Sequence, residues 1–434
     1  MPRIQAAVTA PPFPPSRPTQ SLDVYVFGRN DLGQLGLGYL TDVQLPLLNP
    51  NLPAATVGVV HLAVGLVHAA ALTHDNQILT WGSNINDALG RDTTVDGGDN
   101  TNLFQRQATP GPVDLAAFPA NTSFTQLAVT GSATFVLTTD GLVYGWGTFM
   151  NSTGVLGFSP TVPIQPRPAL IPELTNVAKI VGGANHMLAL TSEGKVFSWG
   201  SNEYSQLGRP RQLRHSNPSH HLVPAQCCVP SRILDISAGY YHSFAIHRWG
   251  DVYAWGSNDW GQTALRSHVG QSIVEFPQKV PVLKRADRIT SIQSGRDHCH
   301  IIDETAQCHS WGRIDNLGIG VNSLAFDPSD VVFDDQGNRS ILKIPEQVAP
   351  YVLFMESLAA GTDHTVAITN TGLGYSWGLS NRHQAGQSLT YGNQIIHPGR
   401  LRSNDINGKR LNFAGCGHEF SIVAGRHTAP ANNT

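Results

Sequence analysis

The chain has 434 residues, of which 41% are hydrophobic and only 14% charged, and it contains 43 glycines. Low charge with frequent glycine favours short buried strands joined by tight turns over long surface helices. The formal net charge of −3 excludes a global electrostatic drive toward nucleic acid or anionic lipid. Five scattered cysteines without a C-x-x-C motif indicate reduced thiols rather than a disulfide framework. No apolar run approaches the ~18 residues of a membrane span, so no membrane partner is expected.

The first segment, residues 1–21, is rich in proline and contains no acidic residue. The prolines oppose an amphipathic targeting helix, and an apolar secretory core is lacking. We therefore predict a flexible Pro-rich tail here and a second flexible tail at residues 426–434. A Lys/Arg cluster of the nuclear-import type is also absent from the sequence.

From residue 22 onward an aromatic-glycine pair recurs at intervals of 53 to 66 residues. A narrow spacing with two longer steps indicates one structural unit that carries loop insertions. The pairs are Phe27-Gly28, Trp81-Gly82, Trp146-Gly147, Trp199-Gly200, Trp255-Gly256, Trp311-Gly312 and Trp377-Gly378.

A second marker, Gly-x-x-His, keeps a fixed register with the first. In five units its glycine lies 17 residues before the glycine of the aromatic-glycine pair, and Thr130 and Ala133 hold the corresponding places in the third unit. The markers are Gly65/His68, Gly183/His186, Gly239/His242, Gly295/His298, Gly361/His364 and, near the end, Gly415/His418.

Each 17-residue interval has the pattern of a strand, a turn and a strand, as in HMLALTSEGKVFSWG (residues 186–200). A small antiparallel sheet of this kind cannot bury both faces alone, whereas seven arranged radially bury one another. The sequence thus predicts an all-β fold, a seven-bladed β-propeller over residues 22–425.

The two ends of the repeat region are half-units. Gly415/His418 has no aromatic-glycine strand after it, and SLDVYVFGRND (residues 21–31) has no Gly-x-x-His before it. We predict that these N-terminal and C-terminal strands complete one blade and so close the ring.

The unit also ends in a characteristic way, as GRNDLGQLGLG (28–38), GSNEYSQLGR (200–209) and GSNDWGQ (256–262). These segments resemble the repeat of the regulator of chromosome condensation family, and the resemblance covers almost all of the chain. WGSNINDALGRDTTVDGGD (81–99) and WGTFMNSTGVLGF (146–158) are similar to the second and third blades of its guanine nucleotide exchange factor for the GTPase Ran.

This resemblance implies nucleotide exchange on Ran by displacement, with no bond made or broken and no cofactor. The face that carries the Gly-x-x-His turns would bind the GTPase. A loop of the third blade would act as a wedge against the phosphate-binding region of the GTPase, formed here by Phe149, Met150, Asn151, Ser152, Thr153, Gly154, Val155 and Leu156.

Carrying the family's contact positions over gives a mixed result. Matching residues stand at Asp31, His68, Arg209 and His418, whereas Gly131, Asn185 and Asp297 replace an expected Asp, Asp and His. Lost charge at such positions weakens pairing with a partner. The alternative is therefore an exchange-deficient propeller that serves as a scaffold for chromatin or protein.

The resemblance also implies a nucleosome-facing loop of the fourth blade at RPRQLRHSNPSHH (209–221), with Arg211 and Arg214 as the contact residues. A solvated basic loop is the competing interpretation. Ran and histones are the implied partners of a monomeric, nuclear protein, with a cytoplasmic location as the alternative.

Two further signals favour structural roles or simple exposure. One histidine per blade would be spread around a ring and cannot converge on one ion, so no metal site is expected. The repeat tryptophans are predicted to pack between blades. Trp249 and Trp260 fall outside that pattern and are candidates for exposed contact residues.

Overall fold

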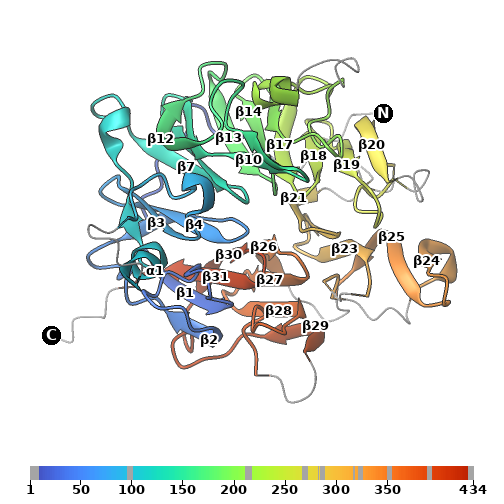
Figure 1. Cartoon of the computed structure of the whole chain (residues 1–434). Helices are drawn as coiled ribbons and strands as arrows, with labels where there is room; N and C mark the ends of the chain where they lie inside the picture. Colours follow the sequence, from blue (N-terminus) through green and yellow to red (C-terminus); the bar gives the residue numbers. More distant parts are fainter. Residues whose placement is uncertain are drawn as a thin grey trace.

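The computed structural model describes residues 9–94, 101–210, 218–265, 272–281, 283, 289–315, 318–320, 326–348, 354–388 and 393–428. Seven antiparallel sheets stand radially around a central axis (Figure 1). The predicted all-β seven-bladed propeller is therefore confirmed. None of the helices in the described ranges has the length and apolar character needed to span a membrane.

The seven blades are numbered from the one that contains both ends of the repeat region, which is blade 1. Blade 1 consists of β30 (Leu411–Cys416), β31 (Phe420–Arg426), β1 (Leu22–Gly28) and β2 (Val43–Leu48). Blade 2 consists of β3 (Val59–Val64), β4 (His68–Thr73), β5 (Ile78–Gly82) and β6 (Gly111–Pro112). Blade 3 consists of β7 (Phe124–Val129), β8 (Ala133–Thr138), β9 (Val143–Gly147) and β12 (Gln165–Leu170). Blade 4 consists of β13 (Val177–Gly182), β14 (His186–Thr191), β15 (Val196–Gly200) and β16 (Ala225–Gln226).

The remaining blades follow the same strand order. Blade 5 consists of β17 (Ile233–Ala238), β18 (His242–His247), β19 (Val252–Ser257) and β20 (Ile273–Lys279). Blade 6 consists of β21 (Ile289–Ser294), β22 (His298–Asp303), β23 (Cys308–Arg313), β25 (Arg339–Gln347) and β24 (Val331–Phe333). Blade 7 consists of β26 (Met355–Ala360), β27 (His364–Thr369), β28 (Gly374–Leu379) and β29 (Gln394–Arg400).

Short elements lie in the connections. A two-stranded hairpin, β10 (Phe149–Asn151) and β11 (Gly154–Gly157), is inserted in blade 3. In the part of the chain that the structure describes, the helices are α1 (Thr101–Ala108) and the 3-10 turns η1 (Ile85–Asp87), η2 (Leu115–Ala117), η3 (Pro218–Leu222) and η7 (Pro328–Asp330).

The 17-residue register has a simple structural origin: it places the repeat histidine directly opposite the repeat glycine. His68 pairs with Gly82, and His186 with Gly200, at the same end of the second and third strands. Gly200 has φ +111°, and a Cβ there would lie 2.6 Å from the carbonyl oxygen of Asn185. The same positive φ recurs at the corresponding glycine of all seven blades. A side chain at this point would therefore strain every blade.

The repeat histidine joins neighbouring blades. His68 Nε2 lies 3.0 Å from Thr134 Oγ1, and this hydroxyl donates to the carbonyl of Ala88 at 2.9 Å. The indole of Trp146 donates to the same carbonyl at 3.0 Å. Because the hydroxyl proton is used, His68 must donate from Nε2. The matching pairs are His186–Ser243, His242–Cys299, His298–Thr365 and His364–Ser421.

Two blades lack this histidine, and the facing residue changes with it. At the equivalent positions, Ala133 and Met187 belong to one apolar cluster, and Phe420 and Ala69 belong to another. An apolar pair leaves no buried hydroxyl without a partner, so the contact between blades is kept.

Blade 1 requires a correction to the predicted register. Gly28 pairs with Phe420, and the amide of Gly417 donates to the carbonyl of Phe420 at 2.9 Å, as Gly65 does to His68. The repeat marker is therefore Gly417/Phe420, and the assignment of Gly415/His418 to it is wrong. Phe420 stands where the other units have a histidine, so the Gly-x-x-His pattern does not mark this unit.

The predicted closure of the ring is confirmed. β1 pairs with β31 from Leu22–Arg426 to Gly28–Phe420, and Figure 1 shows these strands side by side. The amide of His427 donates to the Ser21 carbonyl at 2.8 Å, so the paired region extends slightly beyond the expected boundary at residue 425.

The segment before β1 also differs from the expected tail. Arg17 donates to the carbonyls of Thr73 and His74, Pro15 is buried, and the Phe13 ring lies against Gly141. Part of the predicted 1–21 tail therefore packs on blades 2 and 3, at the ends that carry the turns between second and third strands.

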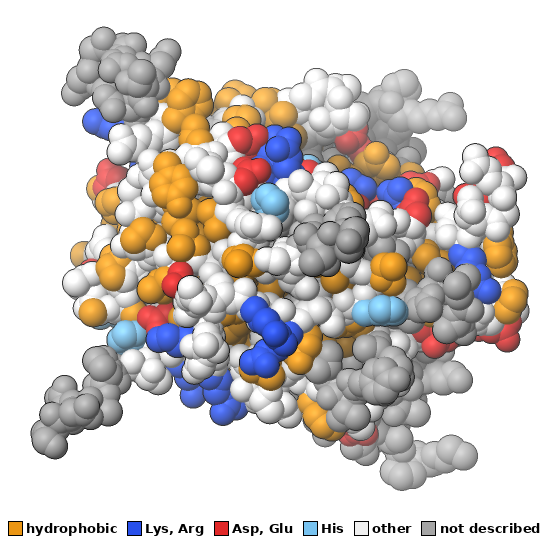
Figure 2. Space-filling view, turned by 90° about the horizontal axis from the view of Figure 1, so that it is seen from below, with side chains coloured by type: hydrophobic (Ala, Val, Ile, Leu, Met, Phe, Trp, Pro, Cys, Tyr) orange, Lys and Arg blue, Asp and Glu red, His pale blue; other side chains and the backbone are white. Residues whose placement is uncertain are grey.

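On the flank toward blades 1 and 7, acidic, basic and apolar side chains are intermixed (Figure 2). This arrangement agrees with a formal net charge of −3. Contacts that discriminate between partners must therefore be sought in local groups of residues.

The buried repeat histidines predict that the stability of the protein decreases in acid. Burial lowers the pKa of His68, His186, His242 and His364 from 6.5 to about 3, and that of His298 to about 4. Between pH 6.5 and these lowered pKa values the unfolded chain binds more protons than the folded chain, so the stabilisation is complete above about pH 6.5 and is lost as the pH falls toward 3. Urea unfolding at pH 7.5, 6.5 and 5.5 should show it, with each histidine contributing up to about 1.4 kcal/mol per pH unit.

The control is the double variant His68→Phe/Thr134→Ala, which copies the Phe420–Ala69 pair. Its free energy of unfolding should depend less on pH than that of the parent protein. Identical pH dependence of the two proteins would contradict the role assigned to His68.

Candidate functional site

The turns between the first and second strands of the blades lie on one side of the ring, here called the histidine face. Each turn presents two variable residues between the repeat glycine and the repeat histidine or its replacement. They are Leu66/Val67, Gly131/Ser132, Ala184/Asn185, Tyr240/Tyr241, Arg296/Asp297, Thr362/Asp363 and His418/Glu419 in blades 2 to 7 and 1. The variable residues of blades 2 to 5 are uncharged, and these turns are here called the uncharged sector. The turns of blades 6, 7 and 1 contain the charged residues and are here called, with the neighbouring charged side chains, the charged sector.

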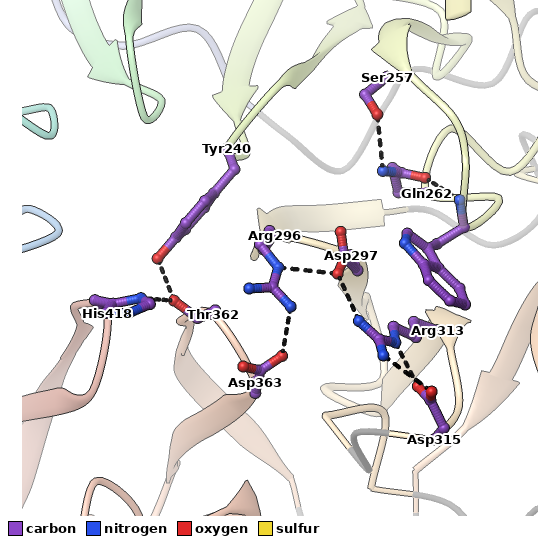
Figure 3. A network of polar contacts seen from close by, with 11 residues as sticks. Tyr240, Ser257, Gln262, Arg296, Asp297, Arg313, Asp315, Thr362, Asp363 and His418 are labelled. Atoms are coloured by element: carbon purple, nitrogen blue, oxygen red, sulfur yellow. Dashed lines mark hydrogen bonds and ion pairs between the residues drawn. The ribbon is translucent and has the colours of Figure 1, made fainter. Parts of the chain in front are cut away.

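Arginines and carboxylates alternate in the charged sector (Figure 3). Arg296 Nε lies 2.9 Å from Asp297 and its NH2 group 3.1 Å from Asp363. Arg313 approaches Asp297 at 3.3 Å and Asp315 at 3.0 Å. Partial burial opposes charge on Arg296, but the neighbouring carboxylates, Asp297 first, keep its pKa raised. The network crosses from blade 6 to blade 7 and fixes these side chains relative to one another.

A second charged group lies on blade 1. Arg29 contacts Asp31 and Glu419, each at 2.5 Å. The hydrogen bond to Asp31, followed by that to Glu419, raises the pKa of Arg29. Partial burial works to raise the pKa of Asp31, but the hydrogen bond and charge of Arg29 lower it overall. Glu419 is thus part of a site that the misplaced marker in blade 1 concealed.

A chain of polar contacts joins the variable turns of blades 5, 7 and 1. The Tyr240 hydroxyl bonds Thr362 Oγ1, which lies 2.7 Å from His418 Nδ1 (Figure 3). Tyr240 also lines an axial cavity of about 310 Å³, together with the first strands of the blades. Burial is the main cause of the raised pKa of Tyr240, so this phenol stays protonated at neutral pH.

The inserted hairpin of residues 149–157, here called the blade-3 hairpin, follows the repeat glycine Gly147 and so leaves blade 3 on the histidine face. Phe149 is fully buried and stacks on Phe135 at 5.7 Å between ring centroids. Ser152 and Thr153 are exposed, and Val155 is 45% exposed. The predicted loop therefore exists as a hairpin, but Phe149 anchors it in the core and is not a surface residue.

The turn of the blade-3 hairpin contacts the next blade. The amide of Ser152 lies 3.1 Å and 3.0 Å from the two carboxylate oxygens of Glu203, and Ser152 Oγ bonds the same carboxylate. Gly154 has φ +121° with open space around it, so backbone conformation alone requires a glycine here.

Two of the predicted contact residues have internal roles. The side chain of His68 is 0% exposed, so the prediction that it contacts a partner is wrong. Arg209 donates to the carbonyls of Val223 and His221 at 3.2 Å and 2.9 Å, much as Arg91 does in blade 2. Burial lowers the pKa of Arg209. It braces its own blade, and the structure does not present it as a contact residue.

The other predicted residues remain on or near the histidine face. Asn185 and His418 are half-buried there, and Asp31 is exposed. Asp297 is 7% exposed and lies between two arginines, so it does not offer a separate carboxylate. Gly131 occupies the first variable position, and the residue that precedes the histidine position in blade 3 is Ser132.

The remaining expectations concern the two unusual tryptophans and the basic loop. The Trp260 ring lies 4.1 Å from the guanidinium carbon of Arg313, and Trp249 packs against His247. Both are half-buried, and Trp260, which follows β19 of blade 5, contacts Arg313 of the charged sector. Arg211 and Arg214 lie outside the described residues.

Three comparisons with known proteins agree with this architecture. Residues 23–423 match the family described as RCC1-like domain. Protein pim1 of Schizosaccharomyces pombe is 34% identical over 95% of this chain and 76% of its own length. The guanine nucleotide exchange factor SRM1 of Saccharomyces cerevisiae is 29% identical over 94% of this chain and 88% of its own.

Among solved structures, that of Prp20p from Saccharomyces cerevisiae, a protein described with its binding to Gsp1p and histones, has a TM-score of 0.88. It is 29% identical, and the match covers 96% of this chain and 94% of Prp20p. The fold is therefore shared with Prp20p, and the chain belongs to the RCC1-like domain family.

Proposed function

We propose that this protein is a guanine nucleotide exchange factor for a small GTPase of the Ran type. The observation that carries the proposal is the blade-3 hairpin, which is anchored in the core and stands beside the variable turns of the histidine face. Its place in the third blade is the one that the family resemblance implies for the wedge. The exchange-factor name of SRM1 supports the same activity.

Exchange of this kind depends on the difference between the binding free energies of the factor for two forms of the GTPase. The factor must bind the nucleotide-free GTPase more tightly than the loaded GTPase, because only a differential affinity shifts the equilibrium. The blade-3 hairpin would enter the phosphate-binding region and compete with the nucleotide there. Phe149 and Glu203 fix its base and its turn before contact, so little ordering cost remains on docking.

The two sectors of the histidine face would then have different tasks. The uncharged variable turns of blades 2 to 5, together with the hairpin that Glu203 of blade 4 contacts, would cover the part of the GTPase from which nucleotide leaves. The charged sector carries more acids than bases and would attract a basic surface of the GTPase. Its acids are Asp31, Asp297, Asp315, Asp363 and Glu419, and its bases are Arg29, Arg296 and Arg313.

Removal of the hairpin should abolish exchange and leave the ring intact. A variant in which residues 150–156 are replaced by two glycines keeps Phe149 in the core. We expect release of a fluorescent guanine nucleotide from Ran to slow by at least about 100-fold, on the scale of a lost set of directing contacts. Trimming Asp335–Gly337 between β24 and β25 of blade 6 is the matched control and should leave the rate unchanged. Equal rates for all three proteins would refute the role of the hairpin.

Asn185 should limit the rate. It stands half-buried on the histidine face where the resemblance implies an aspartate, and a carboxylate there can pair with a basic residue of the GTPase. We expect Asn185→Asp to increase kcat/KM for nucleotide release by about tenfold, as for one charge-assisted contact. Asn185→Ser provides the uncharged control. A rate that falls or stays constant in Asn185→Asp would show that the position does not contact the GTPase in this way.

Binding to chromatin is a second candidate function, because Prp20p is described with its binding to histones. It would place the protein in the nucleus and would also suit a propeller that has lost exchange activity. Arg211 and Arg214 are the proposed contacts to the acidic surface of the nucleosome. Arg211→Ala/Arg214→Ala should weaken retention on immobilised mononucleosomes and leave nucleotide exchange unchanged. Unaltered retention would exclude this loop.

A further inference from the structure

We propose that Glu203 is the positioning residue of the blade-3 hairpin. Its carboxylate fixes the orientation of the Ser152–Thr153 turn before any GTPase is bound. The inference rests on the proposed exchange function and assigns to it a residue outside the variable turns and outside the hairpin itself.

The repeat explains why this carboxylate is directed at the hairpin. Asp31, Glu203 and Asp315 occupy the same place, three residues after the repeat glycine. Where an arginine follows that glycine, as at Arg29 and Arg313, it binds the acid two residues later.

Blade 4 departs from that pattern at two positions. It has Ser201 in place of the arginine, and its acid is a glutamate, one methylene longer than aspartate. Both changes allow the carboxylate to reach across to the neighbouring blade, where it accepts hydrogen bonds from the amide and hydroxyl of Ser152.

The loop that carries Glu203 is itself well fixed. The amide of Leu207 donates to Asn202 Oδ1 at 3.1 Å, and the amide of Tyr204 donates to Gln206 Oε1 at 2.9 Å. The Tyr204 ring packs on Tyr241 of blade 5 at 4.8 Å between centroids. The carboxylate therefore starts from a rigid support.

Ser152 at the turn is held from this direction, whereas Asn86 of blade 2 contacts the hairpin one strand away, with its Nδ2 donating to Met150 Sδ at 3.3 Å. Asn151 Oδ1 accepts from the Thr153 amide at 3.0 Å, which shapes the turn but does not orient it relative to the ring. Hydrogen bonds to a charged acceptor are stronger than neutral ones, and they strengthen further when a docked protein excludes water. Glu203 thus holds the turn most firmly in the complex, when a displaced turn would be most costly.

The test compares Glu203→Gln, Glu203→Ala and Ser152→Ala with Asp259→Asn, a matched acid at the same repeat place in blade 5. For Glu203→Ala we expect kcat for nucleotide release from Ran to fall about tenfold, with KM and the melting temperature unchanged. Glu203→Gln should lie between, and Asp259→Asn should match the parent protein. The Glu203→Ala/Ser152→Ala double variant should lose less than the product of the two single losses.

Unchanged kcat in both Glu203 variants, or a loss confined to KM, would overturn the proposal. A second readout does not depend on exchange activity: amide hydrogen exchange at Ser152 and Thr153 should accelerate several-fold in Glu203→Ala. If the parent protein releases no nucleotide, the proposed function fails. Faster amide exchange would then still support the positioning role, and unchanged exchange would refute it.

Discussion

Every blade depends on one close approach, in which the backbone of the variable turn lies against a glycine of the third strand. At Gly256, for example, a Cβ would lie 2.5 Å from the carbonyl of Tyr241, and φ is +104°. The glycine lets the second and third strands stay paired to their ends, so the repeat histidine is directed into the space between blades. There it meets the hydroxyl or thiol of the next blade, and the indole of that blade completes the contact. The packing between blades thus depends directly on the backbone geometry at this glycine.

The same constraint determines what can vary. The interior of each blade junction is fixed by the glycine, by the histidine or its apolar replacement, and by the aromatic residue of the third strand, whereas the two residues that follow the first glycine of each unit lie in the turn on the histidine face. Charge, size and aromatic character can change at these positions without disturbing the ring, as Arg296/Asp297 and Tyr240/Tyr241 illustrate. The histidine face is therefore a rigid frame with replaceable side chains, and a site on such a frame is positioned accurately.

The architecture could be predicted from the sequence because the repeat spacing follows from the pairing of two residues on neighbouring strands, the repeat histidine and the repeat glycine. The fixed interval arises because the repeat histidine, three residues after the first glycine of the interval, lies opposite the glycine that ends it. Loop insertions elsewhere in the unit leave this interval unchanged. The prediction failed where the pair changed chemistry. Phe420 replaces the histidine and belongs to one apolar cluster with Ala69, and the Gly-x-x-His pattern matches His418 instead, two residues too early.

The site was less predictable because its contacts join residues far apart in the chain. Arg296 meets Asp363 of the next blade, and Arg29 meets Glu419 across the closure. Sequence spacing does not predict which carboxylate will form an ion pair with a given arginine. The burial of individual side chains could not be predicted from the sequence either. Histidine and phenylalanine both occur on contact surfaces, yet His68 and Phe149 are buried inside the ring.

Closure by strands from both ends has a consequence for the order of folding. During synthesis β1 is among the first strands made, but its partner β31 follows almost 400 residues later. Until then β1 has one unpaired edge, an arrangement prone to pairing with other chains. The contact between Arg29 and Glu419 forms only at that last step. The histidine face is thus completed when the ring closes, and a partially synthesised chain cannot display the whole face before then.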